Sequence, residues 1–117
     1  MYEAEKLKLR TKRFAVSLIR LFRSLPKTEE ARVIGKQLIR SGTSVAANYR
    51  AAGRARSRAE FIAKIGTVVE ESDETVFWIE MLSEAEILSA SATREVLAEA
   101  NELLAIFAAS QRTARRS

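Results

Sequence analysis

The sequence contains no cysteine and no histidine, and these two absences exclude several kinds of chemistry. Without cysteine the chain has no disulfide, no thiolate zinc site and no thiol nucleophile. Without histidine it lacks the usual general base at neutral pH and the commonest metal ligand. We therefore expect a protein that is not an enzyme and that binds no metal and no cofactor.

Turn-forming residues and long apolar runs are also scarce. The chain has one proline, Pro26, and four glycines, which are too few for the turns of an all-β domain. No run approaches the roughly 20 apolar residues that span a bilayer. Residues 1–14 are charged throughout, where a secretory signal would be apolar. We expect a cytoplasmic protein that makes no membrane contact, and no small-molecule substrate is evident.

Apolar residues recur instead at spacings of three and four, which are typical of amphipathic helices. The length fits a single domain, 1–117. Thr28 and Ser57 are the expected N-caps, and a further capping pattern at 83–86 leaves open a break in the third helix. Short connections place consecutive helices antiparallel, so the predicted fold class is all-α, an antiparallel up-and-down four-helix bundle. The predicted helices span about 3–24, 29–54, 58–86 and 93–112, with a short basic tail at 113–117.

The second predicted helix is rich in small residues, which lower its intrinsic helix propensity. Gly42 and Ala46 lie one turn apart on this helix. We expect them to allow close approach of the third helix, with Gly42 near Ala63 or Gly66.

Several polar and aromatic side chains are interpreted as structural rather than functional. No base is present to activate a serine, so we expect the serines and the asparagine to make buried hydrogen bonds that fix helix register. Exposed aromatic rings can stack on bases, but at helical spacing we favour a core or interface position. The residues concerned are Ser41, Ser44, Asn48, Tyr49, Phe77 and Trp78.

Charge is distributed unevenly along the chain. Residues 1–64 carry 16 basic residues against 5 acidic ones, whereas residues 65–104 carry one basic residue against 10 acidic ones. Residues 105–117 add three arginines. The asymmetry indicates an anionic partner for one half, or attraction between unlike edges of neighbouring subunits.

Basic residues on and after the second helix are the candidate nucleic-acid contacts. Clustered arginines suit phosphate, because each guanidinium can donate two parallel hydrogen bonds. Arg50, Arg54 and Arg58 would line one face if the helix continued through residue 57. The alternative is a solvated face, partly paired with acids of the third helix or of a neighbouring subunit, and it stays open. The candidates are Lys36, Arg40, Arg50, Arg54 and Arg58.

A cluster of carboxylates, Glu70, Glu71, Asp73 and Glu74, lies in the third predicted helix. Di-iron sites in four-helix bundles use Glu-x-x-His motifs that project into the core. Because histidine is absent, we interpret the cluster as a solvated or interface-facing acidic edge rather than a metal site.

Four segments together resemble the four-helix-bundle proteins encoded within 23S rRNA intervening sequences. They are GKQLIRSGTSVAAN at 35–48, RSRAEFI at 56–62, EESDET at 70–75 and ELLAIF at 102–107. Many relatives have Asn-Ile-Ala-Glu-Gly where this chain has Asn-Tyr-Arg-Ala-Ala at 48–52, so an acid is lost and an arginine gained. The resemblance implies a four-helix bundle and a homopentameric ring.

Two functions are consistent with these features of the sequence. The first is a homo-oligomeric, pentameric protein that binds nucleic acid, namely RNA, through a basic face. The alternative is a structural or protein-interaction assembly module with no nucleic-acid role. The position of Arg50, Arg54 and Arg58 distinguishes them, since these side chains are either paired with acids or exposed as one surface.

Overall fold

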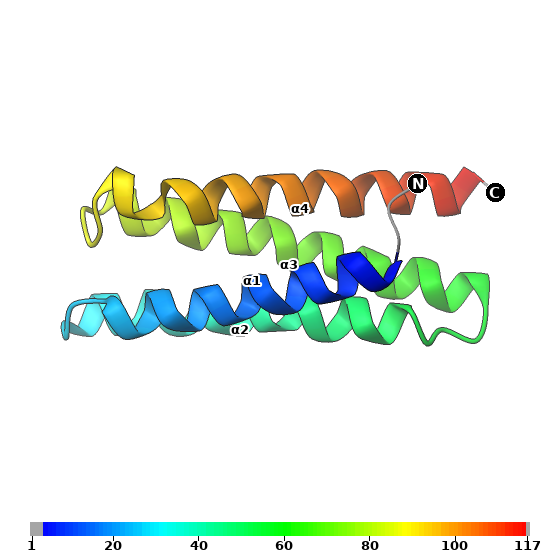
Figure 1. The fold of residues 1–117 in the computed structure, drawn as a ribbon, viewed down its shortest axis with the longest axis horizontal. Helices are drawn as coiled ribbons and strands as arrows, with labels where there is room; N and C mark the ends of the chain where they lie inside the picture. The colour runs from blue at the N-terminus through cyan, green and yellow to red at the C-terminus, as the bar shows by residue number, and fades with distance from the viewer. Residues whose placement is uncertain (1–3, 117) are drawn as a thin grey trace.

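The computed structural model describes residues 4–116, and in that range it contains four helices and no strand. The helices run alternately up and down and form a bundle about 46 × 20 × 20 Å in extent (Figure 1). The predicted fold class is confirmed. The helices are α1 (Ala4–Ser24), α2 (Glu29–Ala52), α3 (Arg58–Glu84) and α4 (Ala90–Arg116).

The first two connections have the caps that the sequence predicts. The Thr28 hydroxyl accepts a hydrogen bond from the backbone N–H of Ala31 at 3.3 Å. The Ser57 hydroxyl accepts one from Glu60 at 3.0 Å. Each cap satisfies one of the N–H groups that a helix start leaves without an intrahelical partner, and this explains why α2 and α3 begin where predicted.

Several predicted helix ends are wrong. The second helix ends at Ala52 rather than 54. The third ends at Glu84 rather than 86, within the capping pattern at 83–86 that left open a break there. The fourth begins at Ala90 rather than 93, because the Ser89 hydroxyl accepts a hydrogen bond from the N–H of Ala92. It continues to Arg116, so the predicted tail is helical as far as the structure describes it. Residue 3, predicted to start the first helix, lies outside the described residues, as does residue 117.

The end of α3 forms a Schellman motif. The N–H of Ile87 donates to the Leu82 carbonyl at 2.9 Å and the N–H of Glu86 donates to the Ser83 carbonyl at 3.1 Å. Glu86 has φ of 60°, in the left-handed region that this motif requires and that glycine adopts most readily.

Replacing Glu86 with glycine is therefore expected to stabilise the bundle by about 0.5–1 kcal/mol, because it removes the steric cost of a side chain in this conformation. Ala85, with φ of −84°, is the matched control. Ala85→Gly gains no such relief and should lower stability. Thermal unfolding followed by circular dichroism measures both, and a Glu86→Gly protein that melts below the parent would contradict the prediction.

The core runs the length of the bundle and draws on all four helices. The contact between helices is most extensive between α2 and α3 and between α3 and α4, and it is least extensive between α1 and α4. α1 and α3 make no close contact and therefore lie diagonally across the bundle. The largest fully buried apolar side chains are Leu18, Leu38, Val45, Ile65, Val68, Ile79, Leu82, Leu103 and Phe107.

The two glycines of α2, Gly35 and Gly42, face α1 and not α3. A Cβ atom at Gly42 would lie 2.1 Å from Leu18 Cδ1, and one at Gly35 would lie 2.7 Å from Leu25 Cδ1. The expected contact of Gly42 with Ala63 or Gly66 is therefore wrong. Gly35 and Gly42 are two turns apart on one face of α2, and that face receives Leu18 from within α1 and Leu25 from just after its end.

A polar contact joins α2 to α3 inside the core. The Thr75 hydroxyl donates to the Ser41 hydroxyl at 2.9 Å, and both residues are fully buried. Asn48 donates to the carbonyl and the hydroxyl of Ser44, both at 2.9 Å. The expectation of buried hydrogen bonds that fix helix register is confirmed for Ser41, whereas Ser44 and Asn48 are half-buried and the bonds of Asn48 lie within α2. A buried pair of this kind stabilises one register of the two helices over a slipped one.

Candidate nucleic-acid interface

The five candidate residues do not form one patch. Lys36 lies in the first half of α2 and Arg50 in its last turn, 14 residues or about 21 Å along the helix axis. Because α2 ends at Ala52, Arg54 lies in the connection that follows and Arg58 begins α3. The uninterrupted helix that would have aligned Arg50, Arg54 and Arg58 does not exist.

Arg40 is engaged by the acidic edge of α3. Its guanidinium forms ion pairs with Glu71, at 3.3 Å, and with Glu74. The Trp78 indole N–H donates to Glu74 at 3.2 Å, and the Ser44 hydroxyl donates to Glu71 at 3.2 Å. The hydrogen bond from Trp78 and the charge of Arg40 lower the pKa of Glu74. The bond to Glu74 raises the pKa of Arg40. This part of the basic surface is paired within the chain.

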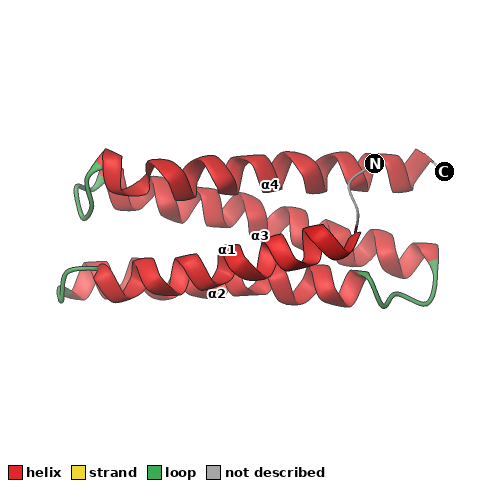
Figure 2. Cartoon of the chain, viewed as in Figure 1, coloured by secondary structure: helices red, strands yellow, loops and turns green. Residues whose placement is uncertain are grey.

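The other arginines gather at one end of the bundle. In Figure 1 the connection between α2 and α3 and the last turn of α4 lie at the same end, and Figure 2 shows that connection as a loop. Arg56 lies in this loop beside Arg54, and α4 adds three further arginines that the candidate set did not include. We call this surface the arginine end. Its members are Arg50, Arg54, Arg56, Arg58, Arg112, Arg115 and Arg116.

Arg58 holds the two parts of the arginine end together. Its Nε donates to the backbone carbonyl of Ala114 at 3.0 Å, and its Nη2 to that of Arg115 at 3.2 Å. These carbonyls belong to the last turn of α4, where they lack intrahelical partners and carry partial negative charge. The guanidinium thus caps α4 and fixes its last turn beside the start of α3.

The remaining six arginines of this surface are exposed or nearly so and have no ion pair with any carboxylate between residues 4 and 116. At this end, residues 4–10, 50–64 and 108–116 contain 11 basic and 2 acidic residues. At the opposite end, residues 20–36 and 78–95 contain six of each. The bundle therefore has one strongly positive end and one balanced end, and the positive end attracts polyanions.

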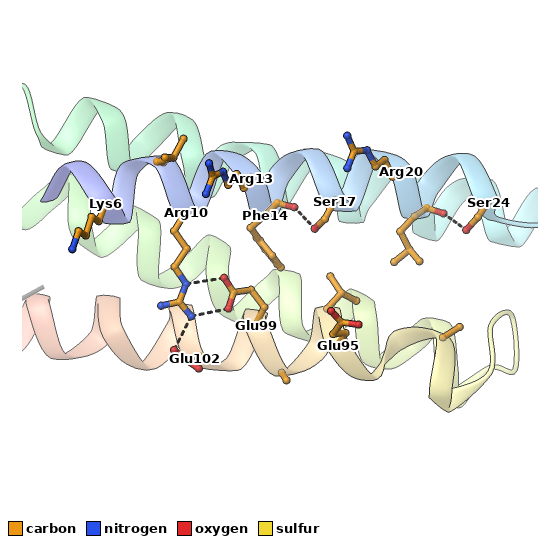
Figure 3. A pocket seen from close by; sticks show the side chains of 15 residues that line it. Lys6, Arg10, Arg13, Phe14, Ser17, Arg20, Ser24, Glu95, Glu99 and Glu102 are labelled. Atoms are coloured by element: carbon orange, nitrogen blue, oxygen red, sulfur yellow. Dashed lines mark hydrogen bonds and ion pairs between the residues drawn. The ribbon is translucent and has the colours of Figure 1, made fainter. Parts of the chain in front are cut away.

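A groove of about 980 Å³ lies between α1 and α4 (Figure 3). Arg10 crosses it and binds Glu99 through two hydrogen bonds of 2.8 and 2.7 Å and Glu102 through one of 2.7 Å. The hydroxyls of Ser17 and Ser24 donate to carbonyls of their own helix. Arg10 thus links α1 to α4 across the groove, whereas the two serines bond only within α1.

The described residues form neither a metal site nor a membrane-spanning helix. No group of three or more carboxylate side chains is arranged to hold a metal ion there. No helix within residues 4–116 has the length and apolarity needed to cross a membrane.

The match to known proteins covers most of these elements. The family model of the 23S rRNA-intervening sequence protein matches residues 5–109. The chain belongs to this family. The matched region includes α1, α2, α3 and most of α4. The arginines of the last turns of α4, Arg112, Arg115 and Arg116, lie beyond it, so part of the arginine end falls outside the matched residues.

A solved structure supports the same assignment. A protein of unknown function from the S23 ribosomal protein family of Bacteroides thetaiotaomicron superposes with a TM-score of 0.83 and 31% sequence identity. The alignment covers 90% of this chain and 97% of that one. No curated protein matches the sequence significantly.

In this member of the 23S rRNA-intervening sequence proteins the aromatic side chains have different surroundings. Tyr49 packs against Phe107 with ring centroids 5.3 Å apart, and burial raises the pKa of its hydroxyl. Trp78 is half-buried, and its ring contacts that of Phe77 edge-on at 4.9 Å. Phe77 itself is 49% exposed. Tyr49 therefore packs against the core as expected, whereas Phe77 does not, and an interface position for Phe77 stays a prediction.

Proposed function

We propose that this chain is a non-enzymatic, homopentameric RNA-binding protein of the cytoplasm, and that the arginine end contacts the phosphates. The observation that carries the proposal is the gathering of six exposed arginines at one end of the bundle, none of them in an ion pair with a carboxylate of residues 4–116. Guanidinium groups without carboxylate partners are available for the paired hydrogen bonds that phosphate accepts.

The chemistry of this surface favours contacts with the backbone rather than with bases. The exposed aromatic ring of Phe77 lies on α3, among acids and well away from the arginine end. Arginine contacts to phosphate position a nucleic acid without reading its sequence. We therefore propose weak affinity with little sequence preference, strengthened when subunits of an oligomer present several arginine ends to one RNA.

Self-association is supported by the charge distribution and by the family resemblance, which implies a pentamer. A second function, an assembly module without a nucleic-acid role, is favoured by one observation. Arg40 is already paired with Glu71 and Glu74 of its own chain, so this part of the basic face is not available to phosphate. The RNA-binding proposal requires the arginine end to contact phosphates, whereas the assembly module gives the arginine end no role.

The parent protein is expected to bind a single-stranded RNA of about 20 uridines, with an affinity that falls steeply as salt is added. The plot of log affinity against log salt should have a slope of about −0.7 for each phosphate neutralised. Fluorescence anisotropy over a series of salt concentrations measures this. A DNA strand of equal length is the control, and similar affinity for both indicates backbone recognition. No binding at low salt, or binding insensitive to salt, would refute the RNA-binding proposal.

A further inference from the structure

Two outward helix faces, on α1 and on α3, have opposite charge and the same layout. On α1 the exposed Val16 is preceded by Lys12 and Arg13 and followed by Arg20 and Arg23. On α3 the exposed Phe77 is flanked by acids three, four and seven residues away. These spacings place each set on one helix face. We call them the α1 stripe (Leu9, Lys12, Arg13, Val16, Arg20, Arg23) and the α3 stripe (Glu70, Asp73, Phe77, Glu80, Glu84).

The charges of the two stripes are not paired with other residues between 4 and 116. Val16 is 40% exposed, Leu9 47% and Phe77 49%. Because α1 and α3 lie diagonally across the bundle, the two stripes point away from each other. A single chain cannot bring them together.

We propose that the α1 stripe of one copy of this chain binds the α3 stripe of a second copy. This inference rests on the self-association in the proposed function and names its interface. Apolar side chains at the centre with charges around them follow the usual organisation of a protein interface. Opposite charge across the contact selects this pairing over α1 with α1 or α3 with α3.

The two stripes also lie at the same height in the bundle. α1 and α3 run in the same direction and end at the same end (Figure 1). Val16 lies eight residues before the end of α1 and Phe77 seven before the end of α3, so both are about 11 Å from that end. Arg13 and Asp73 each lie eleven residues before their helix ends, and Arg20 and Glu80 each lie four before.

This match in height determines the kind of assembly. A contact between unlike faces gives a ring if rotation alone relates the copies, and a filament if each copy is also displaced along the axis. With the stripes level, a rotation about an axis parallel to the helices pairs them without displacement. The copies then form a closed ring in which every arginine end lies on the same side.

Charge reversal tests the pairing. The variants Arg13→Glu/Arg20→Glu and Asp73→Arg/Glu80→Arg are each expected to raise the concentration at which the assembly half-dissociates by roughly tenfold or more. The variant that combines all four changes restores opposite charge across the contact and should assemble again. Light scattering at micromolar concentration gives the mass of each, and circular dichroism confirms that each one is folded.

The apolar centre is tested by a matched pair of valines. Val16→Asp, on the α1 stripe, should dissociate the assembly. Val33 on α2 is 56% exposed and has acids before it and a lysine after it, so Val33→Asp should assemble as the parent does. If the parent assembles and Val16→Asp and both reversals assemble equally well, this interface is refuted while self-association stands. A monomeric parent refutes both, and RNA binding by that monomer would leave the arginine end as proposed.

Discussion

Replacing Gly42 with leucine is expected to lower the free energy of unfolding by about 3 kcal/mol, the upper part of the range for overpacked core positions. Even a single methyl group at Gly42 would lie 2.1 Å from Leu18 Cδ1. Leu18 is fully buried and is held by the core around it, so it cannot turn aside without displacing its neighbours. An isobutyl group would force α1 away from α2.

Two further glycine variants make this prediction specific. Gly42→Ala adds helix propensity worth about 1 kcal/mol but meets the same leucine, so its loss should be smaller than that of Gly42→Leu. Gly53→Leu is the control, because Gly53 is exposed, has φ of −65°, and a Cβ there would meet nothing closer than 3.5 Å. It should change stability by no more than about 0.5 kcal/mol. Urea unfolding measures all three, and a Gly42→Leu protein as stable as the parent would show that the contact with Leu18 is absent.

The second large effect is expected on RNA binding. The triple variant Arg50→Glu/Arg54→Glu/Arg56→Glu should lose at least about tenfold in RNA affinity at moderate salt, because three phosphate contacts are replaced by repulsion. Arg58 is left unchanged, since its hydrogen bonds to α4 are structural. The variant Arg112→Glu/Arg115→Glu/Arg116→Glu should show a similar loss, although these residues are distant in the sequence.

A charge-matched variant at the other end is the control. Lys27→Glu/Arg32→Glu/Lys36→Glu changes the net charge by the same amount, and all three residues are exposed. Its RNA affinity should stay well above that of the two arginine-end variants. Equal losses in all three variants would mean that overall charge, rather than the arginine end, governs binding. Light scattering and circular dichroism must first show that each variant assembles and folds as the parent does.

Much of the fold is predictable from local signals in the sequence. Apolar spacing predicts four helices, and Thr28 and Ser57 correctly predict the starts of α2 and α3 because a cap is decided by residues within one turn. The errors are the ends of α2, α3 and α4 and the start of α4. Glu86 has a left-handed backbone at a position where glycine is the usual residue, so the end of α3 lacks the glycine signal, and only the capping pattern at 83–86 indicated a break there. Ser89 is a cap that the capping-box pattern does not include.

The candidate site was less predictable, because it depends on which segments meet. Arg50, Arg54 and Arg58 suggested a helix face, whereas the chain turns after Ala52 and the three are brought together at the bundle end instead. The arginines of α4 have no sequence pattern that links them to residues 50–58. The up-and-down topology supplies the link, since it places the second connection and the C-terminal helix end together.

The sequence also did not predict which side chains of different helices contact one another. Small residues in α2 predicted a close approach but not its partner, and the partner proved to be Leu18 of α1. The same holds for Arg40, whose pairing with Glu71 and Glu74 depends on how α2 and α3 are rotated about their axes. The rotation and the register of packed helices depend on many side chains at once, and no single residue spacing predicts them.

RNA is proposed to lie against the arginine end. The most direct test of this contact is photo-crosslinking of the parent protein to a single-stranded RNA that carries 4-thiouridine, with the crosslinked peptides identified by mass spectrometry. We expect crosslinks in residues 50–58 and 108–116, and a loss of those crosslinks as salt is raised. Crosslinks confined to the opposite end, residues 27–40, or to the α1 stripe would contradict the claim.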